Sequence, residues 1–161
     1  LFACTAAGVR ISDLFKLKWK NFNGTHILFT QQKTREQNGI KLPLKALAIL
    51  EGYKSQTGEF SENYIFPFLT NQTEALDIFD SVSSMTAYAN KNLKEIARMA
   101  GIEKHITTHT ARHTFATRAL RKGIRIENVS KLLGHSSIKT TQVYAKIVNE
   151  ELDKSMEVFN E

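Results

Sequence analysis

The 161-residue sequence predicts one domain that is mainly α-helical, with a small antiparallel sheet of three short strands near its front. Three observations predict this class. Apolar residues recur at helical spacing through most of the second half of the chain. The β-type runs THILFTQ and GIKLPL are confined to residues 25–44. Glycines stand at the ends of most predicted helices, where helices commonly stop.

Residues 1–44 are predicted to hold two short helices followed by the sheet. The segment LFACTAAG reads as a helix end with Gly8 as its stop, and Ser12 is expected to cap a second helix that extends to Leu17. The segment NFNG marks a turn before the strands, and the polar link QKTREQN separates the two β-type runs. Pro43 fits the end of a strand.

The rest of the chain is predicted to be helical around one long, irregular connection at residues 55–81. A helix is expected in LKALAILEGYK before the connection, and a long amphipathic helix in VSSMTAYANKNLKEIARMAG after it, ending at Gly101. Four further helices follow. One is capped by Thr108 and stopped by Gly123, one ends at Gly134, and two occupy IKTTQVYAKIV and EELDKSMEVF.

The composition favours some classes of function over others. A net charge of +6 and a pI near 9.5 favour a polyanionic partner such as nucleic acid. The single cysteine, Cys4, excludes an internal disulfide framework and indicates a reducing, intracellular setting. No apolar run has the length of a membrane span, and no signal peptide is visible. Because Leu1 begins as if partway through a helix, we expect an excised domain or a processed fragment.

The segment THTARH places a histidine and an arginine on one helical face. His109 and Arg112 are three residues apart at the start of a predicted helix, where a core-facing apolar stripe begins. An unpaired guanidinium is costly to bury, so a partner is expected. A phosphate would fit, because helix N-termini favour anions, and a nearby carboxylate is the alternative.

Four more residues are unremarkable singly and informative together: Arg10, Lys33, His135 and Tyr144. Two arginines can each bind phosphate oxygens through two N–H groups, and histidines and a lysine can donate hydrogen bonds or move protons. A tyrosine hydroxyl, with a pKa of about 10, can attack phosphorus and later leave. This set of groups is suited to phosphoryl transfer without a metal ion.

The order of these residues resembles a known family. AAGVRISDLFKLKW, QQKT, HTARH and LLGHSSIKTTQVYAK are similar to the motifs of tyrosine recombinases, the integrase family of phages and mobile elements. Val9 stands where leucine is commoner. The resemblance implies the DNA breaking–rejoining catalytic fold over residues 1–161, with residues 149–161 as a C-terminal tail helix. It also implies that the family's N-terminal DNA-binding domain is absent from this chain.

The resemblance further implies a site-specific recombinase or integrase that cleaves and rejoins DNA through a 3′-phosphotyrosyl link at Tyr144. Arg10 and Arg112 would hold the phosphate, and His135 would support it. His109 would assist proton transfer at the tyrosine, and Lys33 would protonate the leaving 5′-hydroxyl. Contacts with DNA are expected at these two arginines, at Lys33 and the two residues that follow it, Thr34 and Arg35, and at Lys139. No cofactor is implied.

The implied partners are double-stranded DNA and other protomers in a DNA-bound tetramer, with a monomer in the absence of DNA. The implied location is the bacterial cytoplasm, at the nucleoid, without a membrane. Leu152, Met156 and Phe159 form one apolar stripe on the tail. This stripe either packs on its own domain or docks on a neighbouring protomer.

Three alternatives stay open. A type IB topoisomerase uses a similar set of side chains but reseals the same strand. A DNA-binding module could keep the fold without catalysis. His105, His109 and His113 follow one another at four-residue steps, which is a possible zinc-binding pattern. The integration or excision of a mobile element is the favoured role, although the motifs do not separate it from the resolution of chromosome dimers.

Overall fold

The computed structural model describes residues 1–33, 35–57, 60–74 and 77–156, with only the backbone described for residues 57, 150–152 and 154–155. It is mainly α-helical, as predicted. The elements in chain order are α1 (Phe2–Thr5), α2 (Ile11–Phe15), the 3₁₀ helix η1 (Trp19–Asn21), β1 (His26–Thr30), β2 (Gln37–Lys41), α3 (Leu44–Thr57), α4 (Asp77–Met99), α5 (Thr108–Arg121), α6 (Ile126–Leu133) and α7 (Lys139–Met156).

The sheet is smaller than predicted. Within the described residues it has two antiparallel strands, with His26 opposite Lys41, so the expectation of three strands is wrong. The segment before β1 forms η1 instead, and Phe22 makes only an isolated bridge with Ile27. Oδ1 of Asn21 accepts a hydrogen bond from the backbone amide of Lys18 at 2.9 Å. This local bond competes with strand pairing.

Helix ends follow the glycine pattern closely and the predicted caps less closely. Gly101, Gly123 and Gly134 adopt φ values of 66°, 77° and 61°, the left-handed conformation that ends a helix. The predicted caps at Ser12 and Thr108 are wrong, because α2 and α5 are preceded by Arg10 and Thr107. At α5 the Thr107 amide donates to Oγ1 of Thr110 at 3.0 Å, which moves the cap back by one residue.

Two helices extend beyond their predicted limits. The long amphipathic helix α4 begins at Asp77, inside the predicted connection. The two helices predicted in IKTTQVYAKIV and EELDKSMEVF form one continuous helix, α7, because no glycine or proline interrupts them. Met156 is exposed on this helix. The side chain of Leu152 and the whole of Phe159 lie outside the described residues, so the predicted stripe stays a prediction.

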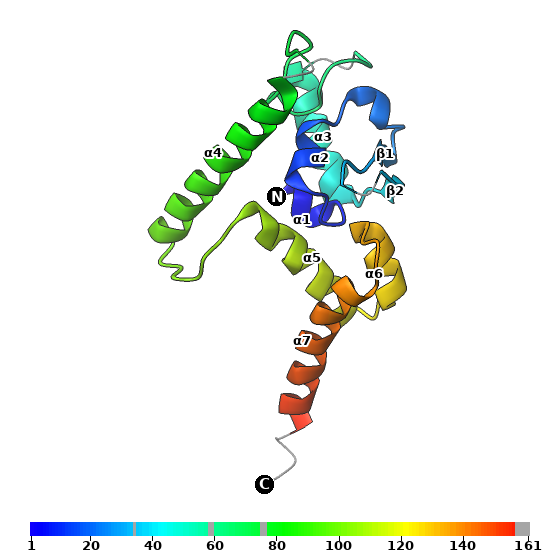
Figure 1. Cartoon of the computed structure of the whole chain (residues 1–161), viewed down its shortest axis with the longest axis vertical. Coiled ribbons are helices and arrows are strands. Elements are labelled where there is room, and N and C mark those ends of the chain that lie inside the picture. Colours follow the sequence, from blue (N-terminus) through cyan, green and yellow to red (C-terminus); the bar gives the residue numbers. More distant parts are fainter. Residues whose placement is uncertain (34, 58–59, 75–76, 157–161) are drawn as a thin grey trace.

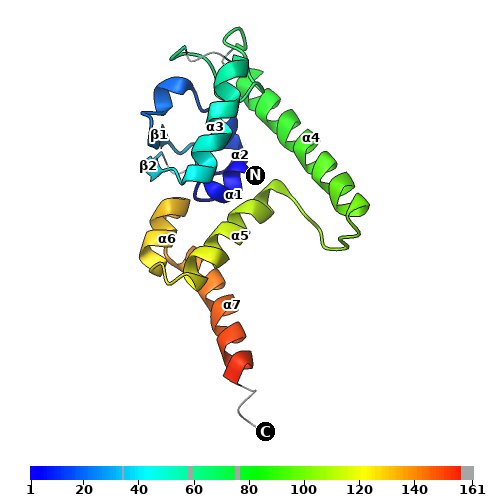
Figure 2. The ribbon, with the colours of Figure 1, turned by 180° about the vertical axis from the view of Figure 1, so that it is seen from behind.

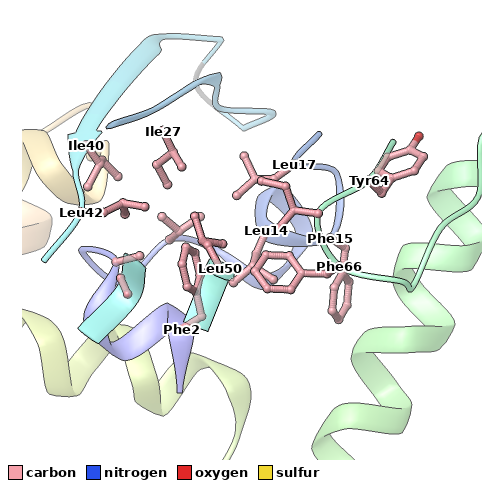
Figure 3. Close-up of a cluster of buried hydrophobic side chains, with 14 of the residues drawn as sticks. Phe2, Leu14, Phe15, Leu17, Ile27, Ile40, Leu42, Leu50, Tyr64 and Phe66 are labelled. Atoms are coloured by element: carbon pink, nitrogen blue, oxygen red, sulfur yellow. The ribbon is translucent and has the colours of Figure 1, made fainter. Parts of the chain in front are cut away.

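Two groups of buried side chains stabilise the fold. The larger core lies between α1, α2, α3, the hairpin and residues 64–69, and Figure 3 shows Leu14, Phe15 and Leu50 converging there. The smaller core lies between α5, α6 and α7, and consists of Ala116, Ala119, Val129, Leu133 and Tyr144. Phe115 of α5 packs against both groups. The tyrosine of the last motif is thus part of a packed core within its own chain.

Helix α5 is the central connector of the molecule. It contacts α1, α4, α6 and α7, whereas α4 lies along one side of the body and contacts α2 and α5. Both views show α7 extending away from the body toward the C-terminus (Figures 1 and 2). In the part of the chain that is described, no helix is both long enough and apolar enough to cross a bilayer.

Candidate active site

Arg112 lies at the centre of the site and is buried, with 4% of its surface exposed. Its Nη1 donates to the carbonyl oxygen of Gly8 at 2.9 Å, and its Nη2 donates to the carbonyl oxygen of Leu133. The guanidinium therefore joins α5 to the turn before α2 and to the end of α6. Burial, together with the charge of Arg10, lowers the pKa of Arg112 to about 10, so the group stays cationic at neutral pH.

Gly8 makes this arrangement possible. Its φ of 65° is in the left-handed region, and a Cβ atom there would lie 3.2 Å from the Cα of Arg112 and 3.3 Å from the Cβ of Phe115. Only a glycine lets the turn approach α5 this closely without strain. The predicted helix stop at Gly8 is thus also the point where the first arginine segment contacts the second.

Arg10 follows that turn and faces the same site. Its Nη1 donates to Oε1 of Gln31 at 2.7 Å, and its Nη2 donates to the carbonyl oxygen of Gly134 at 3.4 Å. The carboxylate of Asp13, itself buried, lies 4.0 Å from Nη1. Gln31 also occupies the space where a Gly134 side chain would stand, so the hairpin, α2 and the end of α6 meet here.

His135 follows Gly134 and is partly buried. Its Nδ1 lies 2.8 Å from Oγ1 of Thr141, and its amide donates to the carbonyl oxygen of Ser130 at 3.0 Å. Burial and the charges of Arg112 and Arg10 lower the pKa of His135 from 6.5 to about 4. The ring is therefore neutral at neutral pH and carries a single N–H group.

Tyr144 lies on α7, with 6% of its surface exposed. Its ring centroid is 5.4 Å from that of His113, which in turn is 5.1 Å from that of His109 in an edge-on arrangement. Burial raises the pKa of Tyr144, and the positive charge of Arg112 opposes this rise. Burial and the neighbouring charges of His113, Arg112 and Arg10 lower the pKa of His109.

Lys33 stands on the link between β1 and β2, where it is exposed. Its charge contributes to the lowered pKa values of both His109 and His135, which places it near both rings. It also lines a groove of about 620 Å³ together with Arg10, Lys16, Gln32 and residues of α4 that include Ser83, Thr86 and Asn90. This groove thus has basic side chains on one side, while its α4 side combines these polar residues with the apolar side chains of Phe79, Val82 and Ala87.

The remaining predicted DNA contacts are peripheral. Arg35 and Lys139 are exposed, on the hairpin link and at the first residue of α7, and no contact in the described structure links them to the two arginines. Thr34 lies outside the described residues. The structure thus brings together Arg10, Lys33, His109, Arg112, His135 and Tyr144 and leaves the other predicted contacts at the edge.

Two side chains of the site, Asp13 and His113, were not predicted from the sequence to be part of it. Asp13 had a usable signal, since an acidic residue three positions after Arg10 on a helix can pair with it. The carboxylate also accepts the Gln32 amide at 3.2 Å, which ties α2 to the hairpin. His113 had a weaker signal in the sequence. Its spacing from His105 and His109 fits a zinc-binding pattern, and nothing in the sequence indicates that its ring lies next to Tyr144.

The zinc pattern is not assembled as a site. Helix α5 begins at Thr108, so His105 precedes it and does not continue the helical face of His109 and His113. Within the described residues, no group of three or more histidine, cysteine, aspartate or glutamate side chains is placed to hold a metal ion. The rings of His109 and His113 instead pack against each other and, through His113, against Tyr144.

A pH dependence of stability follows from the histidines. We expect the free energy of unfolding to fall as the pH is lowered from about 6.5 toward 4, because the unfolded chain then binds protons that the partly buried ring of His135 and the ring of His109, both close to other cations, resist. Urea unfolding at pH 7 and at pH 4.5 measures this. His135→Gln should lose less stability over this range, and His105→Gln, at an exposed site, should behave as the wild type. An equal loss in the His135 variant would contradict the explanation.

The chain is similar to a known protein family and to curated members of it. The phage integrase family matches residues 2–151. A curated tyrosine recombinase of Pseudothermotoga lettingae is 32% identical over 146 residues, which cover 89% of this chain and 47% of that protein. The chain spans about half the length of the curated relatives that it matches.

Two solved structures show the same fold. The crystal structure of XerA recombinase aligns with a TM-score of 0.72 and 24% identity, covering 99% of this chain and 56% of that one. The Tn1549 transposon integrase, in complex with a circular intermediate DNA, aligns with a TM-score of 0.63 and 18% identity, covering 88% of this chain and 51% of that one. The predicted fold class is therefore confirmed.

Proposed function

Because the chain belongs to the phage integrase family, we propose that it is the catalytic domain of a site-specific DNA recombinase, which cleaves and rejoins DNA strands through a 3′-phosphotyrosyl intermediate. One observation carries the proposal most directly. A buried tyrosine, Tyr144, shares a site with the buried cation of Arg112, which lies within electrostatic reach of Arg10. Cations next to a hydroxyl nucleophile are what phosphoryl transfer requires.

The two arginines are proposed to bind the scissile phosphate. Arg112 uses two of its donors on the carbonyl oxygens of Gly8 and Leu133, and a guanidinium has five N–H groups, so donors remain for phosphate oxygens. Arg10 is oriented by Gln31 and faces the same site. Fixed cations in a partly dry site stabilise the charge that develops on a pentacoordinate phosphorus.

Tyr144 is proposed to attack the phosphorus, so that a bond from its oxygen to phosphorus forms and the bond to the 5′-oxygen breaks. The tyrosine proton passes to a neutral imidazole, and His109 is the proposed acceptor, because its lowered pKa keeps the ring unprotonated. Lys33, on the exposed hairpin link, is proposed to protonate the leaving 5′-oxygen. Attack by the 5′-hydroxyl of a partner strand reverses these steps and rejoins the DNA.

The partners of the protein belong to the same proposal. We propose double-stranded DNA as the substrate, bound along the groove next to α4, since Arg10, Lys16 and Lys33 line that groove and can pair with phosphates. Strand exchange needs more than one active site, so a tetramer on DNA and a monomer without DNA are proposed. The Tn1549 integrase acts in a transposon, which favours the integration or excision of a mobile element here. The proposed place of action is the bacterial nucleoid.

A nicked suicide substrate tests the proposal. Cleavage next to the nick releases a short strand and traps the protein covalently on DNA. Two duplexes that carry the same target site then separate recombination from topoisomerase-like resealing, because a recombinase exchanges strands between the two sites, whereas a topoisomerase rejoins the strand that it cut and relaxes supercoiled DNA. A DNA-binding module without catalysis would give a shifted complex and no adduct.

Adduct formation is expected to survive excess EDTA, because arginine and lysine side chains provide the positive charge at the phosphate. The yield of trapped protein on the suicide substrate is compared with and without chelator. A magnesium-dependent nuclease in the same buffer confirms that chelation is effective. Loss of adduct that zinc or magnesium restores would contradict the expectation.

A further inference from the structure

We propose that Thr141 is a positioning residue for this reaction. Its buried hydroxyl donates a hydrogen bond to Nδ1 of His135, which leaves the proton of the ring on Nε2, where it can be donated to a phosphate oxygen. The inference rests on the proposed function, because the phosphate belongs to the DNA substrate. The inference adds Thr141 to the site as the residue that keeps the ring proton of His135 on Nε2.

The contact itself is well defined. Oγ1 of Thr141 lies 2.8 Å from Nδ1 of His135, and Thr141 has none of its surface exposed. The threonine is the third residue of α7, whereas the histidine lies on the turn that follows α6. The bond therefore joins two separate segments of the site.

The direction of the bond follows from burial. A threonine hydroxyl can donate or accept, and Nδ1 of a neutral histidine can do either, depending on the tautomer. Within the described residues, His135 is the only side-chain hydrogen-bond partner of Thr141. If Nδ1 carried the ring proton, the hydroxyl proton would be buried without an acceptor, which is costly. The arrangement in which the hydroxyl donates satisfies both groups.

Because the His135 ring is neutral, the nitrogen that carries its single proton decides whether the ring can donate to a phosphate. Burial and the nearby charges of Arg112, Arg10 and Lys33 hold the pKa of His135 at about 4, so the ring is neutral at neutral pH. A neutral imidazole has one N–H group. If that proton were on Nδ1, the ring would present a lone pair to a phosphate oxygen and repel it. With the proton on Nε2, the ring donates.

The same bond links the histidine to the nucleophile. Thr141 and Tyr144 are three residues apart and both are buried, so they share one face of α7. The hydrogen bond from Thr141 thus fixes the start of α7 against the turn that carries His135. In this arrangement the histidine is oriented for the phosphate only while the tyrosine helix is in place.

The tautomer can be measured without DNA. Nitrogen-15 chemical shifts of the His135 ring at pH 7 are expected to show protonated Nε2 and unprotonated Nδ1. Thr141→Val keeps the shape but removes the donor, so the Nδ1-protonated form should increase, whereas Thr141→Ser should keep the wild-type pattern. Thr140→Val, at the exposed neighbouring position, is the matched control. Protonated Nδ1 in the wild-type protein would overturn the inference.

Kinetics provide the second readout. In single-turnover cleavage of the suicide substrate, Thr141→Val should slow adduct formation about tenfold, which is the lower end of the loss seen when a partner that orients a metal-bound histidine is removed. DNA affinity should stay as in the wild type. In a His135→Ala background, the valine substitution should add no further loss, because Thr141 acts through the histidine. Additive losses would overturn the inference, whereas a wild-type protein that forms no adduct at all would overturn the proposed function instead.

Discussion

Tyr144→Phe is expected to abolish the covalent protein–DNA adduct while leaving the fold and DNA binding intact. The hydroxyl oxygen is the proposed nucleophile, and phenylalanine has no atom that can replace it. The ring belongs to the core that Ala116 and Ala119 of α5 form with Val129 and Leu133 of α6, and phenylalanine keeps that packing. The expected effect is therefore a complete loss of the chemical step.

The structure also explains why this substitution should be mild for stability. Within the described residues, the Tyr144 hydroxyl makes no hydrogen bond, so its removal leaves no buried partner unsatisfied. The free energy of unfolding should change by less than about 1 kcal/mol, because the ring keeps its packing and no hydrogen bond is lost. Urea unfolding measures this change.

The measurement is denaturing gel electrophoresis of protein trapped on a labelled suicide substrate, with DNA affinity determined in parallel. Tyr88→Phe is the matched control, because Tyr88 is exposed on α4 and lies outside the site. It should give the wild-type yield of adduct. A normal yield from Tyr144→Phe would show that another residue attacks the phosphorus.

The sequence predicted which residues form the site better than it predicted the contacts that hold their side chains in place. Arg10, Arg112, His135 and Tyr144 were predicted from short motifs, and the structure brings all four together. The reason that Arg112 tolerates burial was not predicted. Its partners within the protein are backbone carbonyl oxygens rather than a carboxylate, and every residue has a carbonyl, so no sequence pattern marks the two that are used.

The same limit applies to the fold. Glycine stops were predicted well, because a left-handed residue at a helix end is a local requirement that glycine meets. The third strand was predicted wrongly, because a side-chain bond from Asn21 competes with strand pairing. The contact of Gln31 with Arg10 joins residues that are far apart in the chain, and periodicity carries no information about such pairs.

Arg112→Lys is expected to reduce cleavage far more than DNA affinity. Lysine keeps one positive charge, so the long-range attraction to DNA is retained. It loses the planar fork that can bind two phosphate oxygens while also bonding to the protein. Removing such a donor from a preorganised oxyanion site typically costs roughly 100-fold or more in rate. Affinity should fall by only a few-fold.

The structure indicates that Arg112→Lys also lowers the stability of the fold. The guanidinium donates to the carbonyl oxygens of Gly8 and Leu133, so it holds the turn that precedes Arg10 against the end of α6, next to His135. A single ammonium group reaches one of these carbonyls at most. The variant should be about 1–3 kcal/mol less stable, which is the cost of leaving a buried acceptor unpaired. Cleavage must therefore be compared at a temperature where both proteins are fully folded.

Single-turnover adduct formation and DNA affinity are measured on the same protein preparations. Arg118→Lys is the matched control, because Arg118 is exposed on the same helix and should tolerate the change in both assays. A second variant, Arg10→Lys, should resemble Arg112→Lys in rate but lose less stability, since Arg10 is less buried and its bonds to Gln31 and Gly134 lie at the edge of the core. If Arg112→Lys lost cleavage and affinity by the same factor, Arg112 would only bind DNA, and the transition-state role proposed for it would be wrong.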